Sequence, residues 1–184
     1  PSSGEVVFAG RRINGLKPHR VCQLGLTRTF QIVQPFPDMT VLENVMVGAY
    51  TRNAHSGQAR RKAGQMLERV GLSHKADTLG RELTLFELKQ LEIGKALASE
   101  PRLLLLDEVA AGLNTVEVED VLTLVRHLNQ EGVTLLIVEH LMKVIMSLSH
   151  RIVVLDFGQK IAEGAPEEIS RNPAVLEAYL GGEA

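Results

Sequence analysis

Runs of consecutive apolar residues mark the strands expected in the second half of the chain. Leu103 to Leu106 is a run of four leucines, and Val133 to Val138 is almost as apolar. Short apolar runs without alternation are typical of strands buried on both faces of a parallel sheet. We therefore expect two doubly buried strands here. A third strand is expected at Ile152 to Leu155, followed by a turn and an extended segment at Lys160 to Ala162.

Apolar residues at helical spacing fill most of the remaining chain. Helices are predicted from Val41, over Gln58 to Val70, over Leu85 to Ser99, after Asn114, over Leu141 to Leu148, and over Pro166 to Leu180 with a break at Pro173. Several starts carry a capping box, in which an N-cap side chain and a glutamate three residues later satisfy free backbone N–H groups. These pairs are Thr40 with Glu43, Thr84 with Glu87, and Asn114 with Glu117.

The order of these elements predicts an α/β fold. Strands and helices alternate after residue 100, which favours a parallel sheet. A short strand at Glu5 to Ala9 and another that ends near Gln31 are expected before the helical stretch. We therefore divide the chain into an N-terminal part of the core (1–39), a helical subdomain inserted in it (40–99), and the rest of the core with the C-terminal helices (100–184).

Composition narrows the class of protein. The 184 residues carry a formal net charge of −2, which gives no reason to expect a nucleic-acid partner. The single cysteine excludes an internal disulfide and fits a reducing compartment. No apolar run approaches the length of a membrane span, and the first residues lack the pattern of a secretory signal. A membrane role would therefore depend on a partner.

Polar side chains follow three of the predicted strands. Asp107 and Glu108 end the leucine strand, Gln31 ends an earlier one and His140 ends a later one. Ligands bind beyond the carboxyl ends of strands in open α/β sheets, where carboxylates can hold Mg²⁺ against a phosphate or orient a water. Each residue also has a purely structural reading: an acidic turn, a surface amide or a hydrogen-bonded histidine.

Taken together and in order, these motifs resemble the nucleotide-binding subunits of ATP-binding-cassette (ABC) transporters. The matching stretches are TRTFQ ending at Gln31, LLLLDE ending at Glu108, AAGLN ending at Asn114 and LLIVEH ending at His140. The stretches MTVLENVMVGA, LEIGKAL and GQKIAEGAPEEI are most similar to the ATPase subunits of branched-chain amino-acid importers. The fold implied is a partial P-loop NTPase core of the ABC type.

The resemblance implies a role for each site residue. Asp107 would be the Walker B aspartate, which holds Mg²⁺ through water, and Glu108 the general base or the carboxylate that orients the water. Gln31 would be the Q-loop glutamine, which reaches the Mg²⁺ or the attacking water and senses the permease, and His140 would be the switch histidine that contacts the γ-phosphate. Residues Ala111, Gly112, Leu113 and Asn114 would form the D-loop, which faces a second ATPase subunit. The family's cofactors are ATP and Mg²⁺, its partners are transmembrane permease subunits, and its place is the cytoplasmic face of the cell membrane.

The chain departs from the family pattern at two points. The phosphate loop, GxxxxGK followed by Ser or Thr, occurs nowhere in the 184 residues. Backbone N–H groups of that loop supply much of the grip on phosphate, so the chain as given is expected to bind ATP weakly or not at all, as a fragment or a pseudo-ATPase would.

The second departure lies at the signature motif. The family's LSGGQ, or LAYGQ in this branch, aligns with Leu83 followed by Thr84, Leu85, Phe86 and Glu87. Leu85 and Phe86 add side chains where the family has small residues, and Glu87 adds a negative charge. This segment is either an altered phosphate-contacting motif or only a capped helix start.

Competing functions therefore stay open at this stage. The first is an ATP-hydrolysing importer subunit, of which this chain is the larger part. The second is a catalytically inactive module that docks on a permease or an intact ATPase subunit. A soluble ABC ATPase of DNA repair or translation is disfavoured by the short helical insertion.

Overall fold

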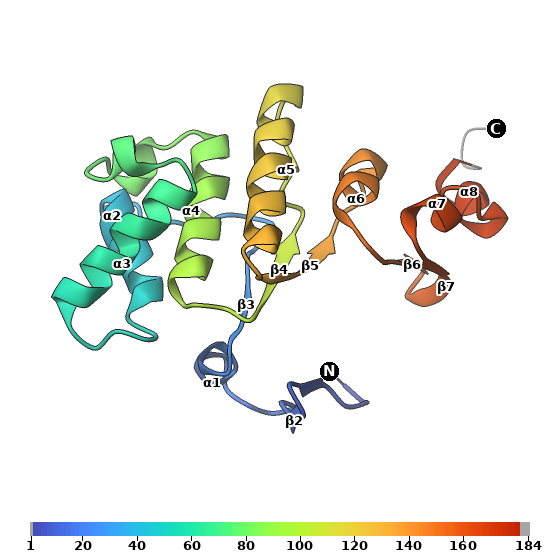
Figure 1. Ribbon diagram of the computed structural model, residues 1–184, viewed down its shortest axis with the longest axis horizontal. Helices are drawn as coiled ribbons and strands as arrows, with labels where there is room; N and C mark the ends of the chain where they lie inside the picture. Colours follow the sequence, from blue (N-terminus) through green and yellow to red (C-terminus); the bar gives the residue numbers. More distant parts are fainter. Residues whose placement is uncertain (1, 181–184) are drawn as a thin grey trace. The chain divides into compact units, whose positions relative to one another are not determined.

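The computed structural model describes residues 2–180, which form two compact units (Figure 1). The first unit ends at Val138 and the second begins at Glu139.

A parallel sheet is the centre of the first unit. It comprises β3 (Leu26–Arg28), β4 (Leu103–Asp107) and β5 (Thr134–Val138), with β4 in the middle and all three parallel. After β3 the chain stays beside β4, because the Thr29 N–H donates to the Leu105 carbonyl at 2.9 Å. The carboxyl ends of β3 and β4 therefore lie at the same edge of the sheet.

Helices make up most of the rest of this unit. They are α1 (Pro18–Gln23), α2 (Val41–Ala49), α3 (Ser56–Arg69), α4 (Leu85–Ala98) and α5 (Thr115–Gln130), with short 3-10 turns at Ser73–Lys75 and Gly80–Glu82. The α2, α3 and α4 helices pack against one another (Figure 1). Gly48 of α2 lets that helix approach α4 closely, because a Cβ there would lie 2.1 Å from the Lys95 carbonyl oxygen of α4.

The predicted capping boxes are confirmed. Thr40 caps α2, Thr84 caps α4 and Asn114 caps α5, each with both reciprocal hydrogen bonds to the glutamate three residues later. The first unit also contains a small antiparallel hairpin of β1 (Val7–Phe8) and β2 (Arg11–Arg12), so the strand expected near the N-terminus is shorter than predicted.

The second unit is built on another hairpin. Its elements are α6 (Met142–Leu148), β6 (Ile152–Asp156), β7 (Gln159–Gly164), α7 (Pro166–Ile169) and α8 (Pro173–Leu180). The tail is broken at Pro173, as predicted. A third parallel strand was also expected from the alternating pattern, and that expectation is wrong for the described residues. Here β6 pairs antiparallel with β7 through a two-residue turn, in which Phe157 and Gly158 both adopt positive φ.

The expectation of two doubly buried strands is only partly met. In β4, Leu104 and Leu106 are fully buried, while Leu103 and Leu105 are half-buried. The expectation is wrong for β5, where Leu136 is 47% exposed and Val138 54% exposed. Among the described residues β5 is an outer strand of its sheet. An apolar run does not by itself show whether neighbouring elements cover both faces of a strand.

Across residues 2–180, the helices lack the combined length and hydropathy that a bilayer span requires.

Candidate active site

Two of the expected site residues meet at the carboxyl edge of the parallel sheet. Gln31 follows β3 and Glu108 follows β4. The side-chain amide of Gln31 donates from Nε2 to Oε2 of Glu108 at 2.7 Å. Although 77 positions separate the two residues in sequence, the parallel pairing of β3 with β4 places them side by side.

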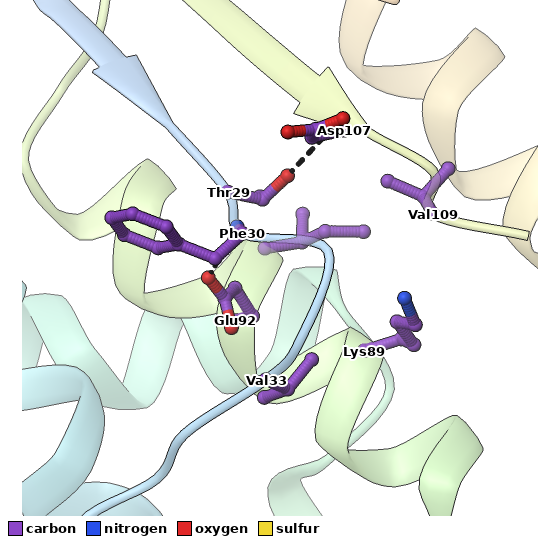
Figure 2. Close-up of a pocket in the computed structure, with 8 residues that line it drawn as sticks. Thr29, Phe30, Val33, Lys89, Glu92, Asp107 and Val109 are labelled. Atoms are coloured by element: carbon purple, nitrogen blue, oxygen red, sulfur yellow. Dashed lines mark hydrogen bonds between the residues drawn. The ribbon is translucent and has the colours of Figure 1, made fainter. Parts of the chain in front are cut away.

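Asp107 is fixed in the same place by its main chain and its carboxylate. Its N–H donates to Thr29 Oγ1 at 3.1 Å (Figure 2). Its carboxylate, 35% exposed, lies 3.4 Å from the Arg28 guanidinium, which also lies over the Phe30 ring at 4.6 Å from the centroid. The Asp107 carboxylate therefore already faces a cation. Sequence reasoning did not single out Arg28, although it belongs to the RTFQ stretch.

Glu108 occupies an unusual backbone conformation. Its φ is 46°, in the left-handed region that residues other than glycine rarely adopt. Its N–H donates to the Val138 carbonyl at 2.9 Å, so the strained residue is anchored to the end of β5. Such strain persists only where surrounding contacts enforce it, and it is concentrated at functional sites.

Two buried charged residues of α4 form hydrogen bonds to the main chain at this edge, and neither was predicted from the sequence. Lys89 as a residue is 4% exposed, and its ammonium donates to the main-chain carbonyls of Gln31 at 3.3 Å and Glu108 at 3.0 Å. Glu92 as a residue is 7% exposed, and its carboxylate accepts the Phe30 N–H at 2.7 Å. The available signal was a lysine and a glutamate three residues apart within the mostly apolar segment LKQLEIG.

A small pocket opens where these groups meet. Figure 2 shows it between the end of β3, the end of β4 and helix α4, with Thr29, Lys89, Glu92 and Asp107 among the residues that line it. Burial raises the pKa of the Glu92 carboxyl; the hydrogen bond from the Phe30 N–H and nearby cations act in the opposite direction but do not cancel the effect.

The segment aligned with the signature motif forms a capped helix start. The Glu87 carboxylate accepts the Thr84 N–H at 2.9 Å and lies 3.1 Å from the Lys75 ammonium. Burial alone would raise the pKa of Glu87, but the hydrogen bonds from Thr84 and Lys75 outweigh it and hold that pKa below its usual value. The negative charge of Glu87 is therefore balanced within the cap. Phe86 is half-buried.

The turn that precedes α5 lies against this helix start. Gly112 has a φ of 78°, and a Cβ added to it would lie 2.9 Å from Cδ2 of Leu85. Ala111 and Leu113 are half-buried, and the Oδ1 atom of Asn114 accepts the N–H groups of the next turn as the α5 cap. The residues expected to form the D-loop thus make a tight turn in contact with Leu85.

His140 belongs to the second unit, where it is exposed and precedes α6. Its expected place beside the γ-phosphate stays a prediction.

The residues at the sheet edge suit Mg²⁺ bound together with a phosphate. Residues 2–180 hold no group of three His, Cys, Asp or Glu side chains arranged to enclose a metal ion. Mg²⁺ does not need such a cage, because it is usually held by one or two carboxylates, by waters and by substrate phosphates. Asp107 and Gln31 offer oxygen ligands of the required kind, and the carboxylate of Asp107 already pairs with a positive charge.

Comparison with known families gives two matches. The family model described as "ABC transporter" matches residues 1–111. A second model, described as "Branched-chain amino acid ATP-binding cassette transporter", matches residues 159–184.

Among curated proteins, the chain is 38% identical to the high-affinity branched-chain amino acid transport ATP-binding protein BraF of Pseudomonas aeruginosa. It is 36% identical to the protein LivG of Salmonella typhimurium, which carries the same description. Both alignments cover 98% of this chain and 77% of the relative.

Solved structures agree with these matches. A nucleotide-free ATP-binding cassette from an ABC transporter superposes with a TM-score of 0.84 at 32% identity, over 96% of this chain and 77% of that one. The ADP conformation of such a cassette gives the same TM-score at 31% identity, over 97% and 77%.

Proposed function

Because this chain belongs to the ABC transporter family, with the P-loop NTPase fold of its ATPases, we propose that it is the ATP-binding subunit of a branched-chain amino-acid importer. The observation that carries the proposal is the Gln31–Glu108 hydrogen bond of 2.7 Å beside Asp107, at the carboxyl edge of the parallel sheet. The names of the LivG and BraF relatives supply the class of solute.

Each residue would have a defined task in hydrolysis. Asp107 would hold Mg²⁺ through water, and Gln31 would orient the attacking water or contact the ion. Glu108 would accept a proton from that water or align it, and His140 would contact the γ-phosphate. The bound Mg²⁺ would neutralise negative charge on the phosphates. Phosphoryl transfer depends mainly on positioning and electrostatics, so residues dispersed over several strand ends are sufficient.

The same proposal extends to partners and place. Transmembrane permease subunits would receive the helical subdomain (40–99), and a second ATPase subunit would face the D-loop from Ala111 to Asn114. The protein would then sit at the cytoplasmic face of the cell membrane. Residues 1–39 and 100–184 would form the nucleotide-binding core.

A first prediction concerns ATP binding. The family's phosphate loop is absent from these 184 residues, and backbone N–H groups of such a loop provide much of the phosphate contact. We expect the chain alone to show no saturable Mg-ATP binding in isothermal titration calorimetry. Joining a segment with the family's phosphate loop, strand and helix in front of Pro1 should produce binding. Tight binding by the chain alone would contradict this expectation.

The alternative function, the runner-up below, is that of a catalytically inactive module that docks on a permease or on an intact ATPase subunit. It is favoured by the cap at Thr84 and Glu87, since the signature segment makes contacts that a helix start needs without any nucleotide. If the loop-restored chain binds Mg-ATP but never hydrolyses it, the runner-up is the better account. An in-frame phosphate loop in the DNA before Pro1 would favour the ATPase instead.

A further inference from the structure

Lys89 is a buried cation that the proposed function does not yet use. It lies in the second turn of α4, and the residue is only 4% exposed. An ammonium group removed from water is strongly unfavourable unless hydrogen bonds and opposite charges compensate it. Both kinds of compensation are present: two carbonyl acceptors, and the Glu92 carboxylate, which interacts with Lys89 electrostatically from the same helix.

The two carbonyls that accept from Lys89 belong to a particular pair of residues. They are the main-chain oxygens of Gln31, at 3.3 Å, and of Glu108, at 3.0 Å. The side chains of the same two residues are hydrogen-bonded to each other. Lys89 therefore closes a ring: one ammonium holds both main chains, and the side-chain contact joins the two residues on the other side.

Glu92 reinforces this arrangement one turn further along α4. Its carboxylate accepts the N–H of Phe30, the residue before Gln31. The loop after β3 is thus held to α4 at two points: the Gln31 carbonyl accepts from Lys89, and the Phe30 N–H donates to Glu92. In the loop after β4, Lys89 binds the carbonyl of Glu108, the residue with the strained φ of 46°.

We propose that Lys89 is a positioning residue, whose ammonium fixes the spacing of the Gln31 and Glu108 main chains and thereby the geometry of their side-chain pair. This assignment rests on the proposed function, since that pair is taken to act on the water. Displacing a catalytic group by about 1 Å can slow a reaction about 100-fold, so a clamp on its main chain matters for rate. Because α4 begins at the signature position, Lys89 also links that helix to the main chain of Glu108.

The test is amide hydrogen exchange on the 184-residue chain, which needs no nucleotide. Lys89→Met keeps the apolar stem and removes the donors. The informative amides are those of Glu108, bonded to Val138, and of Ala111, bonded to the Glu108 carbonyl. Loss of a hydrogen bond to a charged group should speed their exchange about ten-fold or more. Amides of 91–98 within α4 should keep their protection.

Matched variants separate positioning from general stability. Lys89→Arg retains charge and donors and should restore most of the protection. Lys95→Met removes a cation of the same helix whose ammonium lies over the Phe36 ring, 5.4 Å from its centroid, and should leave Glu108 and Ala111 unchanged. Unchanged exchange at both amides in folded Lys89→Met would overturn the proposal.

A direct measurement covers the case in which Lys89→Met fails to fold. In the wild-type chain, a nitrogen-15 NMR spectrum should show a slowly exchanging Lys89 ammonium, as expected for a buried and hydrogen-bonded group. An ammonium that exchanges as fast as those of exposed lysines would overturn the proposal.

A measurement of ATP turnover separates a failure of the Lys89 proposal from a failure of the proposed function. In the loop-restored chain, Lys89→Met should lower kcat about ten-fold while the KM for ATP stays within about two-fold. An increase in KM with unchanged kcat would overturn the positioning role. If the loop-restored wild type binds ATP without hydrolysing it, the proposed function fails, while the exchange experiment still reports on Lys89.

Discussion

At the scale of single residues, the buried Glu92 carboxylate has the clearest electrostatic consequence. Burial raises the pKa of Glu92, so the folded chain takes up a proton there at a higher pH than the unfolded chain does. Between the ordinary pKa of a glutamate and this raised value, the native state binds more protons than the unfolded state. The contribution of Glu92 to stability therefore falls as pH rises through that window, and it is least favourable above the raised pKa.

The second prediction concerns the pH dependence of the contribution that Glu92 makes to stability. In Glu92→Gln the amide oxygen can still accept the Phe30 N–H, but the ionisation is gone. Urea unfolding followed over roughly pH 4 to 8 should show that the stability of wild type relative to this variant declines with rising pH. A relative stability that rises with pH would contradict the raised pKa.

Glu43→Gln serves as a control of opposite sign. The hydrogen bonds from the Thr40 N–H and hydroxyl hold the pKa of Glu43 below its usual value. The benefit of the Glu43 charge should be present above the ordinary carboxyl pKa and be lost as pH falls through the lowered pKa.

Some residues of the site could be predicted from the sequence, and others could not. Asp107, Glu108 and Gln31 could be expected near one another, because carboxyl ends of parallel strands meet at one edge. Lys89 and Glu92 could not, because charges on a helix usually face solvent. Only the packing of α4 against the loops after β3 and β4 makes their charges internal.

At the scale of elements, α4 depends on its N-terminal cap. Thr84 Oγ1 accepts the Glu87 N–H at 3.3 Å while the Glu87 carboxylate accepts the Thr84 N–H at 2.9 Å. Since α4 also carries Lys89 and Glu92, its start and the sheet edge belong to one continuous helix. Such local motifs were predicted correctly because a few neighbouring residues determine them.

The third prediction tests this cap. Thr84→Ala removes the hydroxyl acceptor and should destabilise the chain by about 1 kcal/mol, measured by urea unfolding. Thr84→Ser keeps the acceptor and should cost only a few tenths of that. Equal losses in the two variants would show that the Thr84 methyl group, and not the cap, is what matters.

The burial of the strands, in contrast to the helix caps, could not be predicted from the local sequence. The apolar run of β5 reads like that of β4, yet Leu136 and Val138 are exposed. Burial of a strand depends on distant elements that cover its faces, and a local pattern carries no record of them. The turn after β6 and the segment that follows it were expected, but their antiparallel pairing with β6 was not.

At the scale of the whole molecule, the family and the α/β fold follow from motifs spread over nearly the entire sequence. The aligned relatives cover 98% of this chain. The fold places the residues after β3 and β4 at one edge of a parallel sheet. We therefore propose that Glu108 at this edge promotes hydrolysis of ATP.

Single-turnover hydrolysis in the loop-restored chain tests that claim most directly. Glu108→Gln should bind Mg-ATP as wild type does, and general-base catalysis sets the expected loss of rate at about 100-fold or more. The exposed Glu68 of α3 provides a matched control, since Glu68→Gln should hydrolyse ATP at the wild-type rate. Hydrolysis by Glu108→Gln at the wild-type rate, with equal nucleotide binding, would contradict the account.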